Sequence, residues 1–269
     1  RLDRMNSRTH RKLLVADGRV GFTGGVGIAD LWSGDAQDPD HWRDMHFRVE
    51  GPVVAQLQAG FLDNWIQTTG HVLNGPAYFP PLEPVGDVAA HLFTSSAEGG
   101  SDSMRLMYLL SIASAQRSID LASAYFVPDD VMNQALEAAC RRGVRVRVLV
   151  PGPHLDSELV RVSSKKTWGD LLRAGVEISV YQPTMLHTKL LVVDQRMVSV
   201  GSTNFDVRSF QLNDEASLNL YDAAFAEAMA ATFERDWADG DPYTLQMWED
   251  RPFREKFAET ILRPIRSQL

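Results

Sequence analysis

The chain of 269 residues is 44% hydrophobic and carries a formal net charge of -8, so it can form one large or two smaller domain cores. The acidic balance argues against a general nucleic-acid-binding protein, which usually shows a basic surplus. The single cysteine, Cys140, excludes an intrachain disulfide framework and a CxxC zinc site, and no run approaches the roughly 20 apolar residues of a membrane-spanning helix.

Hydrophobic spacing predicts a series of strands and helices that begins with a strand at 12–16. The prolines and glycines between His71 and Asp87 exclude regular helix and interior strand, so we interpret 71–87 as a linker. Beyond the linker, predicted strands and helices alternate, which favours an α/β sandwich around a mostly parallel sheet. The predicted strands are 88–94, 118–122, 144–150, 176–181, 190–193 and 197–200, and the predicted helices are 101–117, 129–142, 157–174 and 222–237.

Two segments of the chain match position for position. They are THRKLLVADGRVGFTGG (9–25) and LHTKLLVVDQRMVSVGS (186–202), and in each a His is followed by Lys at +2, Asp at +7 and Gly at +14. The segments AGFLDNW (59–65) and ATFERDW (231–237) repeat in the same order. The pattern indicates a duplicated unit rather than a short-period repeat.

The duplication divides the chain into four expected segments. The first copy lacks everything that the second has between Val88 and Tyr181. Its N-terminal part was either truncated, which we favour, or lies in sequence outside this chain. The segments are the C-terminal part of a first half (1–70), the linker (71–87), a second half (88–250) and a basic amphipathic tail (251–269).

The two His–x–Lys pairs, His10 with Lys12 and His187 with Lys189, are the candidate catalytic groups. Residues two apart on a strand face the same side, so each His and its Lys project together. A neutral imidazole can attack phosphorus, and an ammonium group can neutralise phosphate oxygens. Two facing pairs would supply one His for attack and a second to protonate the leaving oxygen.

The other repeated positions suggest support for these pairs. Asp17 and Asp194 follow the histidines by seven residues, beyond the strand, and we expect them to tie the following turn. The pairs Gly24–Gly25 and Gly201–Ser202 permit close backbone approach and offer N–H or hydroxyl donors to phosphate.

The double HxKxxxxDxxxxxxG(G/S) motif resembles that of the phospholipase D superfamily, over nearly the whole chain. More narrowly, TGGVGIAD, WRDMHFRVEGPVV, GVEISVYQPTMLHTK and GSTNFDVRSFQLNDEASL are similar to bacterial cardiolipin synthases. The resemblance implies a duplicated phospholipase D-type α/β fold and an enzyme that uses no metal or other cofactor.

The resemblance also implies a two-step transfer through a phosphohistidine. By analogy His10 is the nucleophile and His187 the general acid and then base, although the sequence alone does not fix that order. Asp44, in the WRD phrase, is the expected counterpart of His10, and Glu215, 28 residues after His187, is the other histidine-orienting carboxylate. The residues expected to hold phosphate are Lys12, Lys189, Ser202 and Asn204.

One position departs from the family pattern. Asn204 follows His187 by 17 residues, and at the same distance after His10 the first copy has Gly27, where the family usually has Asn. The change removes one amide donor to phosphate. If nothing fills the gap, Gly27→Asn should raise turnover; if another group fills it, the substitution should be neutral or harmful. We favour the first outcome, because the rest of the first motif is intact.

The resemblance implies a phosphatidyltransferase that makes cardiolipin and glycerol from two phosphatidylglycerol molecules. With water as acceptor, the same site would be a phospholipase D that releases phosphatidic acid. A nuclease of the superfamily is disfavoured by the acidic balance, and a catalytically impaired lipid-binding fragment is suggested by Gly27 and the missing segment.

The expected partners are anionic phospholipids, phosphatidylglycerol above all, and a membrane surface. The expected location is the bacterial cell membrane, peripherally or through an anchor outside this chain. In the tail 251–269, apolar residues recur every four positions among five basic and two acidic residues. This pattern predicts an interfacial helix or a helix packed on the core.

Overall fold

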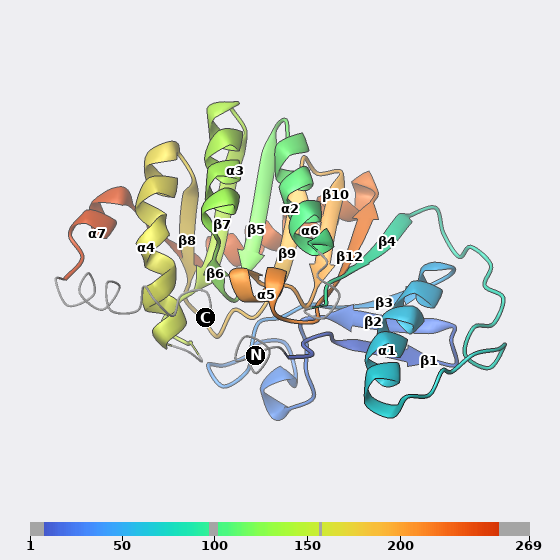
Figure 1. Cartoon of the computed structure of the whole chain (residues 1–269). Coiled ribbons are helices and arrows are strands. Elements are labelled where there is room, and N and C mark those ends of the chain that lie inside the picture. The colour runs from blue at the N-terminus through green and yellow to red at the C-terminus, as the bar shows by residue number, and fades with distance from the viewer. Residues whose placement is uncertain (1–7, 97–101, 156–157, 253–269) are drawn as a thin grey trace.

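The computed structural model describes residues 8–96, 102–155 and 158–252 (Figure 1). Its largest element is an eight-stranded sheet of order β13-β8-β7-β5-β9-β10-β12-β4. The strands of this sheet are β4 (Ala89–Thr94), β5 (Ser118–Ser123), β7 (Arg145–Pro151), β8 (Glu177–Tyr181), β9 (Lys189–Val193), β10 (Met197–Gly201), β12 (Ala216–Tyr221) and β13 (Gly240–Tyr243).

Two smaller sheets complete the strands among the described residues. One is the three-stranded antiparallel sheet of β1 (Leu13–Ala16), β2 (Val20–Gly24) and β3 (His46–Glu50). The other pairs β6 (Phe126–Val127) with β11 (Phe205–Asp206). Residues 71–87, the predicted linker, form neither helix nor strand.

The helices lie mainly in the second half of the chain. None that the described residues form is both long enough and apolar enough to cross a membrane. They are α1 (Val53–Thr69), α2 (Ser103–Ser114), α3 (Asp130–Arg141), α4 (Glu158–Ala174), α5 (Val207–Gln211), α6 (Ala223–Ala238) and α7 (Leu245–Glu249), with a 3-10 helix, η2, at Asp30–Trp32.

The large sheet is mixed, so the prediction of a mostly parallel sheet is wrong. The strands β5, β7 and β8 run parallel to one another, and the other neighbouring pairs are antiparallel. The difference arises from connection length: β9 and β10 are joined by the three residues 194–196, which can connect only antiparallel strands. The parallel strands are instead linked through the crossover helices α3 and α4.

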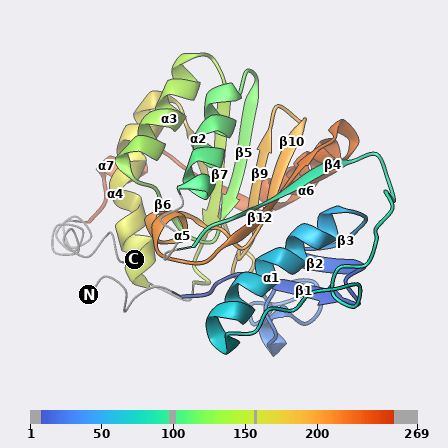
Figure 2. The same ribbon diagram turned by 45° about the vertical axis from the view of Figure 1, so that its right-hand side comes forward.

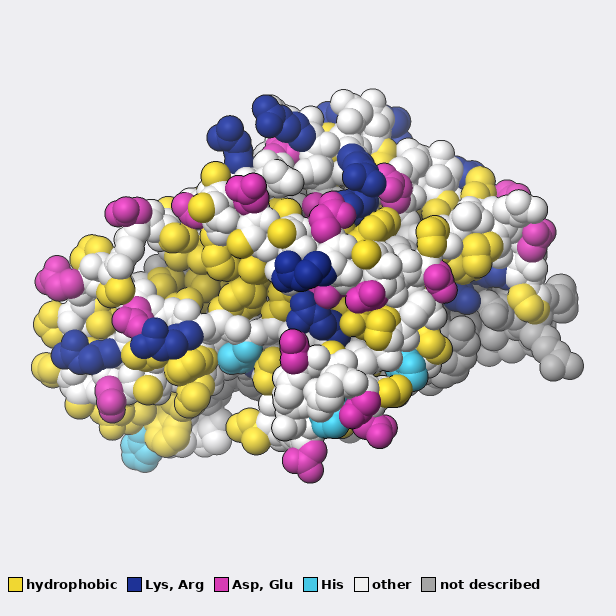
Figure 3. Space-filling view, turned by 180° about the vertical axis from the view of Figure 1, so that it is seen from behind, with side chains coloured by type: hydrophobic (Ala, Val, Ile, Leu, Met, Phe, Trp, Pro, Cys, Tyr) yellow, Lys and Arg dark blue, Asp and Glu magenta, His cyan; other side chains and the backbone are white. Residues whose placement is uncertain are grey.

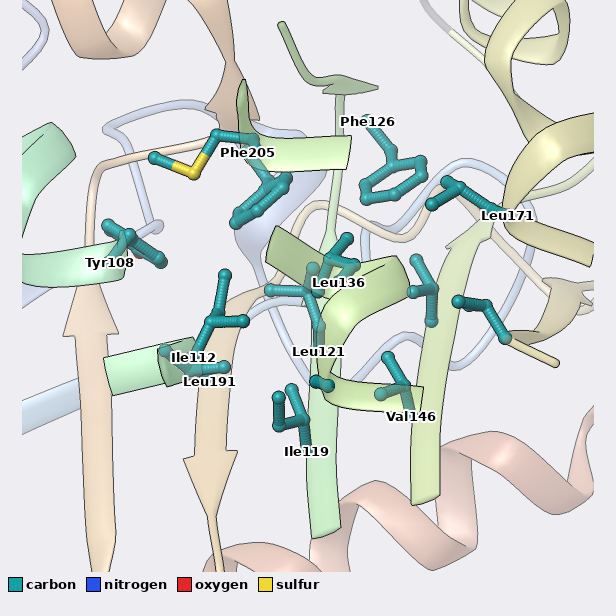
Figure 4. Packing of buried hydrophobic residues seen from close by; sticks show 14 of the residues in the cluster. Tyr108, Ile112, Ile119, Leu121, Phe126, Leu136, Val146, Leu171, Leu191 and Phe205 are labelled. Atoms are coloured by element: carbon teal, nitrogen blue, oxygen red, sulfur yellow. The ribbon is translucent and has the colours of Figure 1, made fainter. Parts of the chain in front are cut away.

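Apolar side chains fill both faces of the large sheet. On one face, α2, α3 and α4 pack on a cluster that includes Ile112, Leu136, Leu171 and Phe205 (Figure 4). On the other face, α6 and side chains of β1 and β3 pack over the central and β12-side strands. The three-stranded sheet and α1 lie beside β12 and β4 (Figure 2).

The two copies of the repeated motif fold alike. The antiparallel strands β1, β2 and β3 followed by α1 correspond to β9, β10 and β12 followed by α6. Even the hairpin turns agree, since Asp17 and Asp194 both have left-handed backbone conformations, with φ of 52° and 53°.

The halves also meet over an apolar surface. From behind, hydrophobic side chains line a hollow in the molecule (Figure 3). Phe47 of β3 and Phe225 of α6 contact edge to face across the halves, with ring centroids 6.1 Å apart. A cavity of about 550 Å³ is lined by Val49, Val53, Val85, Leu220 and Phe225, among others.

Candidate active site

Each half contributes a histidine segment and a carboxylate segment to a seam between them. The segment of Thr9 pairs in parallel with Asp214, and Arg43 pairs in parallel with Leu186. The His10 N–H donates to the Asp214 carbonyl at 2.9 Å, and the His187 N–H donates to the Arg43 carbonyl at 2.8 Å. These reciprocal bridges bring each histidine beside the carboxylate that belongs to the other half.

The first histidine is held by Glu215. Its Nδ1 lies 3.0 and 2.9 Å from the two carboxylate oxygens, and the Glu215 side chain is fully buried while that of His10 is 28% exposed. Because an ionised carboxylate can only accept hydrogen bonds, Nδ1 is the donor. The lone pair of His10 then lies on Nε2, on the ring edge away from Glu215.

The second histidine is held by Asp44, with His187 Nδ1 2.7 Å from Asp44 Oδ2. The pairing is therefore crossed, and our expectation that Asp44 orients His10 is wrong. The reason is the seam: residues 43–44 run beside 186–187 of the other half, whereas the segment of His10 runs beside 214. Glu215 remains a histidine-orienting carboxylate, but its partner is His10.

The two lysines lie together with both carboxylates. Lys12 Nζ donates to the His10 carbonyl at 3.1 Å, and Lys189 Nζ donates to the His187 carbonyl at 2.5 Å. Burial lowers the pKa of Lys189 to about 8 and also lowers the pKa of Lys12, against the opposing effect of Asp44 and Glu215 on both. Each ammonium group has two further N–H donors, so the lysines form one cationic centre between the histidine pairs.

The environment of His187 is aromatic and dry. Its ring lies 5.6 Å from the Trp32 ring and 5.1 Å from the Trp42 ring, centroid to centroid, and its side chain is 8% exposed. Burial and the nearby Lys189 lower the pKa of His187, although Asp44 opposes this. Burial alone would raise the pKa of Asp44, but the bond from His187 and the charge of Lys189 bring it below its ordinary value.

The structure gives Gly25 and Ser202 a different role from the predicted one. Their N–H groups are already bonded, to the Met45 and Ala216 carbonyls, so they are not free phosphate donors. The Ser202 hydroxyl donates to Glu215 Oε2 at 2.5 Å. A side chain at Gly25 would overlap the Asp44 carboxylate, so the predicted close approach is present at this position.

Asp17 and Asp194 lie away from the histidine pairs. Asp194 follows β9, whose first residue is Lys189, so the two lie roughly 16 Å apart along the strand. Its carboxylate accepts the N–H groups of Gln116, Arg117 and Ser118 at 2.7–2.9 Å. Asp194 therefore ties the start of β5 to the hairpin rather than the following turn, and it acts on the fold, not on the reacting atoms.

The amide positions of the two halves differ. Asn204 is buried, and its Oδ1 has no hydrogen-bond partner among the described residues. At Gly27, a Cβ atom would lie 2.9 and 3.0 Å from two carbon atoms of the Trp32 ring. The indole occupies the space of the missing side chain, which favours the prediction that another group fills the gap.

Sequence reasoning missed Trp32 and Trp42. Trp42 stood beside the expected carboxylate in the WRD phrase, and only this adjacency could have indicated it. Trp32 carried no signal, because the repeat contains no tryptophan at the matching place in the second half.

The sequence is similar to bacterial cardiolipin synthases. Residues 108–237 match the family described as "Cardiolipin synthase, PLD-like domain". The chain is 34% identical over 262 residues to the major cardiolipin synthase of Bacillus subtilis (strain 168), across 97% of this chain and 54% of that protein. It is 36% identical over 263 residues to the cardiolipin synthase of Geobacillus thermodenitrificans (strain NG80-2), across 97% and 52%. The chain spans about half the length of these relatives.

Two solved structures share the fold. Phosphatidylserine synthase from Haemophilus influenzae Rd KW20 aligns with a TM-score of 0.73 at 12% identity, across 98% of this chain and 69% of that one. Nuc, a phospholipase D family member from Salmonella typhimurium, aligns with a TM-score of 0.52 at 23% identity, across 59% of this chain and 99% of that one. The predicted phospholipase D-type α/β fold is confirmed.

Proposed function

Because this chain is a cardiolipin synthase-like member of the phospholipase D superfamily, we propose that it transfers a phosphatidyl group from one phosphatidylglycerol molecule to another. The observation that carries the proposal is the crossed site: two histidines, each bonded to a carboxylate of the other half, flank the half-buried Lys12 and the buried Lys189. Such a site contains a nucleophile, an acid and a charge-neutralising pair for a phosphodiester.

In the first step, Nε2 of His10 attacks the phosphorus of the donor lipid. A phosphorus–nitrogen bond forms, the bond to the glycerol oxygen breaks, and His187 gives its Nε2 proton to that oxygen. Glycerol leaves, and the phosphatidyl group stays on His10. Lys12 and Lys189 neutralise the charge that gathers on the phosphate oxygens, and Glu215 stabilises the positive charge of the substituted imidazole.

In the second step, the neutral His187 accepts a proton from a hydroxyl group of the second phosphatidylglycerol. The hydroxyl oxygen attacks phosphorus, the phosphorus–nitrogen bond breaks, and cardiolipin is released. His187 is protonated again and His10 is neutral, so the site returns to its starting state.

The surroundings of the histidines support these roles. His10 is the more exposed of the two and is reachable by a phosphodiester. Burial favours the neutral form of His187 in the empty site, whereas the negative charge of a bound phosphate favours its protonated form. A buried imidazolium with a lowered pKa is a strong proton donor to the leaving oxygen.

We also propose that the substrate is taken from an anionic membrane surface. The tail predicted to bind there lies mostly in residues 253–269, outside the described residues, and its role stays a prediction. Vesicle co-sedimentation with and without residues 253–269 would measure it. Equal binding by the two proteins would exclude the tail.

The function is tested with labelled phosphatidylglycerol in vesicles, followed by separation of the lipid products. Cardiolipin is the expected product, and it should be absent with His10→Ala. Phosphatidic acid instead would show that water is the acceptor. Absence of both products from a folded protein would contradict phosphatidyl transfer by this chain.

A further inference from the structure

Trp32 makes four contacts at the His187 side of the site. Its indole Nε1–H donates to Asp44 Oδ2 at 3.0 Å, the same oxygen that accepts from His187 Nδ1 at 2.7 Å. Its ring packs edge to face on the His187 ring and fills the space beside Gly27. It also contacts Trp42, with ring centroids 4.8 Å apart.

In the second half, a different residue donates the second hydrogen bond to the carboxylate oxygen that holds the histidine. There the Ser202 hydroxyl donates to Glu215 Oε2, the oxygen nearest to His10 Nδ1. The residue that matches Ser202 in the first half is Gly25, where a side chain would overlap Asp44. The first half therefore has no room for a serine hydroxyl at this place, and the indole of Trp32 supplies the second donor to Asp44 Oδ2.

From this exchange of donors we infer that Trp32 is a positioning residue for the proposed acid: it holds the Asp44 carboxylate with its N–H and packs its ring against the His187 ring. Its role in turnover rests on the proposed function, whereas its effect on the His187–Asp44 pair does not. The other charged groups that act on His187 are Lys189 and Lys12.

The direction of the effect follows from the shared oxygen. A second donor on Oδ2, beside the Met45 N–H that already binds Oδ1, takes up part of the negative charge of Asp44, so the carboxylate stabilises the His187 imidazolium less. Removing the indole N–H returns that charge to His187. The imidazolium is then more stable, and His187 titrates at higher pH and is a weaker acid.

The test is a histidine NMR titration of Trp32→Phe, without lipid. His187 is one of seven histidines, and its signals are assigned by their loss in His187→Gln. We expect its titration midpoint to rise by about half a pH unit or more, and its Nδ1–H proton signal at neutral pH to move downfield. Trp42→Phe is the matched control, because it replaces the other indole that packs on His187 by a smaller ring. No hydrogen bond joins the Trp42 indole to any described residue, so this substitution removes no donor.

A second variant perturbs Trp32 without replacing it. Gly27→Ala places a methyl group against the indole ring and should displace its N–H from Asp44. The titration midpoint of His187 should then rise as it does in Trp32→Phe. The inference would be overturned if the titration midpoint of His187 stayed unchanged in both variants, or if it changed equally in Trp42→Phe. Because these spectra need no substrate, that result is distinct from failure of phosphatidyl transfer, which the product assay reports separately.

Discussion

Asp44 and His187 belong to different halves of the chain and are joined by a hydrogen bond of 2.7 Å across the seam. Glu215 and His10 form the reciprocal bond at 2.9 Å. Neither half therefore holds a complete histidine–carboxylate pair. Duplication of the motif supplied two histidine segments of the same pattern, but the arrangement of the site depends on how the halves are docked.

The crossed pairing predicts which histidine responds to each carboxylate. Asp44→Asn should move the Nδ1–H NMR signal of His187, and Glu215→Gln that of His10, because an amide oxygen accepts a weaker hydrogen bond than a carboxylate does. Each variant should lose roughly 100- to 10,000-fold in turnover, as for the orienting carboxylate of other histidine catalysts. The opposite pairing of variants and histidines in the spectra would contradict the structure.

A covalent phosphohistidine is expected on His10. Acid-labile label from a phospholipid should accumulate in His187→Ala, because release of the phosphatidyl group needs the base that this variant lacks. No label should be found in His10→Ala, and peptide mapping identifies the site. Label on His187 would reverse the roles of the two histidines, and no label in any folded variant would exclude the two-step mechanism.

Turnover should fall on the alkaline side as Lys189 loses its proton. Burial lowers the pKa of Lys189 to about 8, so its ammonium charge is present below that pH and is lost above it. In Lys189→Arg the charge persists at all accessible pH values, so the alkaline decline should move upward even if turnover is lower. The pH–rate profiles measured with and without EDTA should be the same, because the proposed steps use no metal. Activity that is lost in EDTA and restored by a divalent ion would contradict these steps.

Asp206 should make the fold less stable at neutral than at acid pH. Burial raises its pKa to about 7, a backbone bond from Ser209 opposes this, and Glu215 adds to it. Between about pH 4 and pH 7 the folded chain keeps a proton that the unfolded chain releases, so the free energy of unfolding from this group falls as pH rises. Above pH 7 the loss is complete, at most about 4 kcal/mol.

The measurement is denaturant unfolding of Asp206→Asn across this pH range. Asn can still cap α5 as Asp206 does at Ser209, but it does not titrate. The free energy of unfolding of the variant, relative to that of the parent protein, should rise from pH 4 to pH 8. Asp222→Asn, at the equivalent cap of α6, is the control and should stay within about 0.5 kcal/mol. A constant difference between Asp206→Asn and the parent would contradict a neutral carboxyl in the fold.

Much of the fold was predictable because local patterns determine it. Six strands and the helices α3 and α6 lie within one or two residues of their predicted ranges, since their periodicity and caps are local; the six strands are β4, β5, β7, β8, β9 and β10. The strands β6, β11, β12 and β13 had no predicted range. The mostly parallel arrangement was predicted wrongly, although the predicted strands 190–193 and 197–200 leave only the three residues 194–196 between them, which requires an antiparallel pair. The candidate residues of the site were also readable, but their pairing was not: Asp44 meets His187 only through the docking of the halves. Trp32 was not predicted as a site residue for the same reason, since its role depends on contacts with residues distant in sequence.

Gly27 is the place where sequence and structure lead to opposite expectations. From the repeat alone, we favoured Gly27 as a defect that Asn would repair. In the structure, a Cβ atom at this position would lie 2.9 Å from the Trp32 ring, closer than such contacts allow, so the indole must move. Its N–H would then leave Asp44, and a displacement near 1 Å at such a group can cost about 100-fold in rate.

Gly27→Asn should therefore lower turnover by roughly 10- to 100-fold at saturating lipid, in a protein shown to be folded. The matching experiment is a double-mutant cycle with Trp32→Phe, whose smaller ring leaves room for the new side chain and whose indole bond is already absent. If Asn acts by displacing the indole, its harm in the Trp32→Phe background should largely disappear, because the two changes break the same interaction. Equal harm in both backgrounds would show that Asn acts elsewhere. A tenfold rise in turnover from Gly27→Asn alone would show that the first half does lack a phosphate donor, and that Trp32 does not replace it.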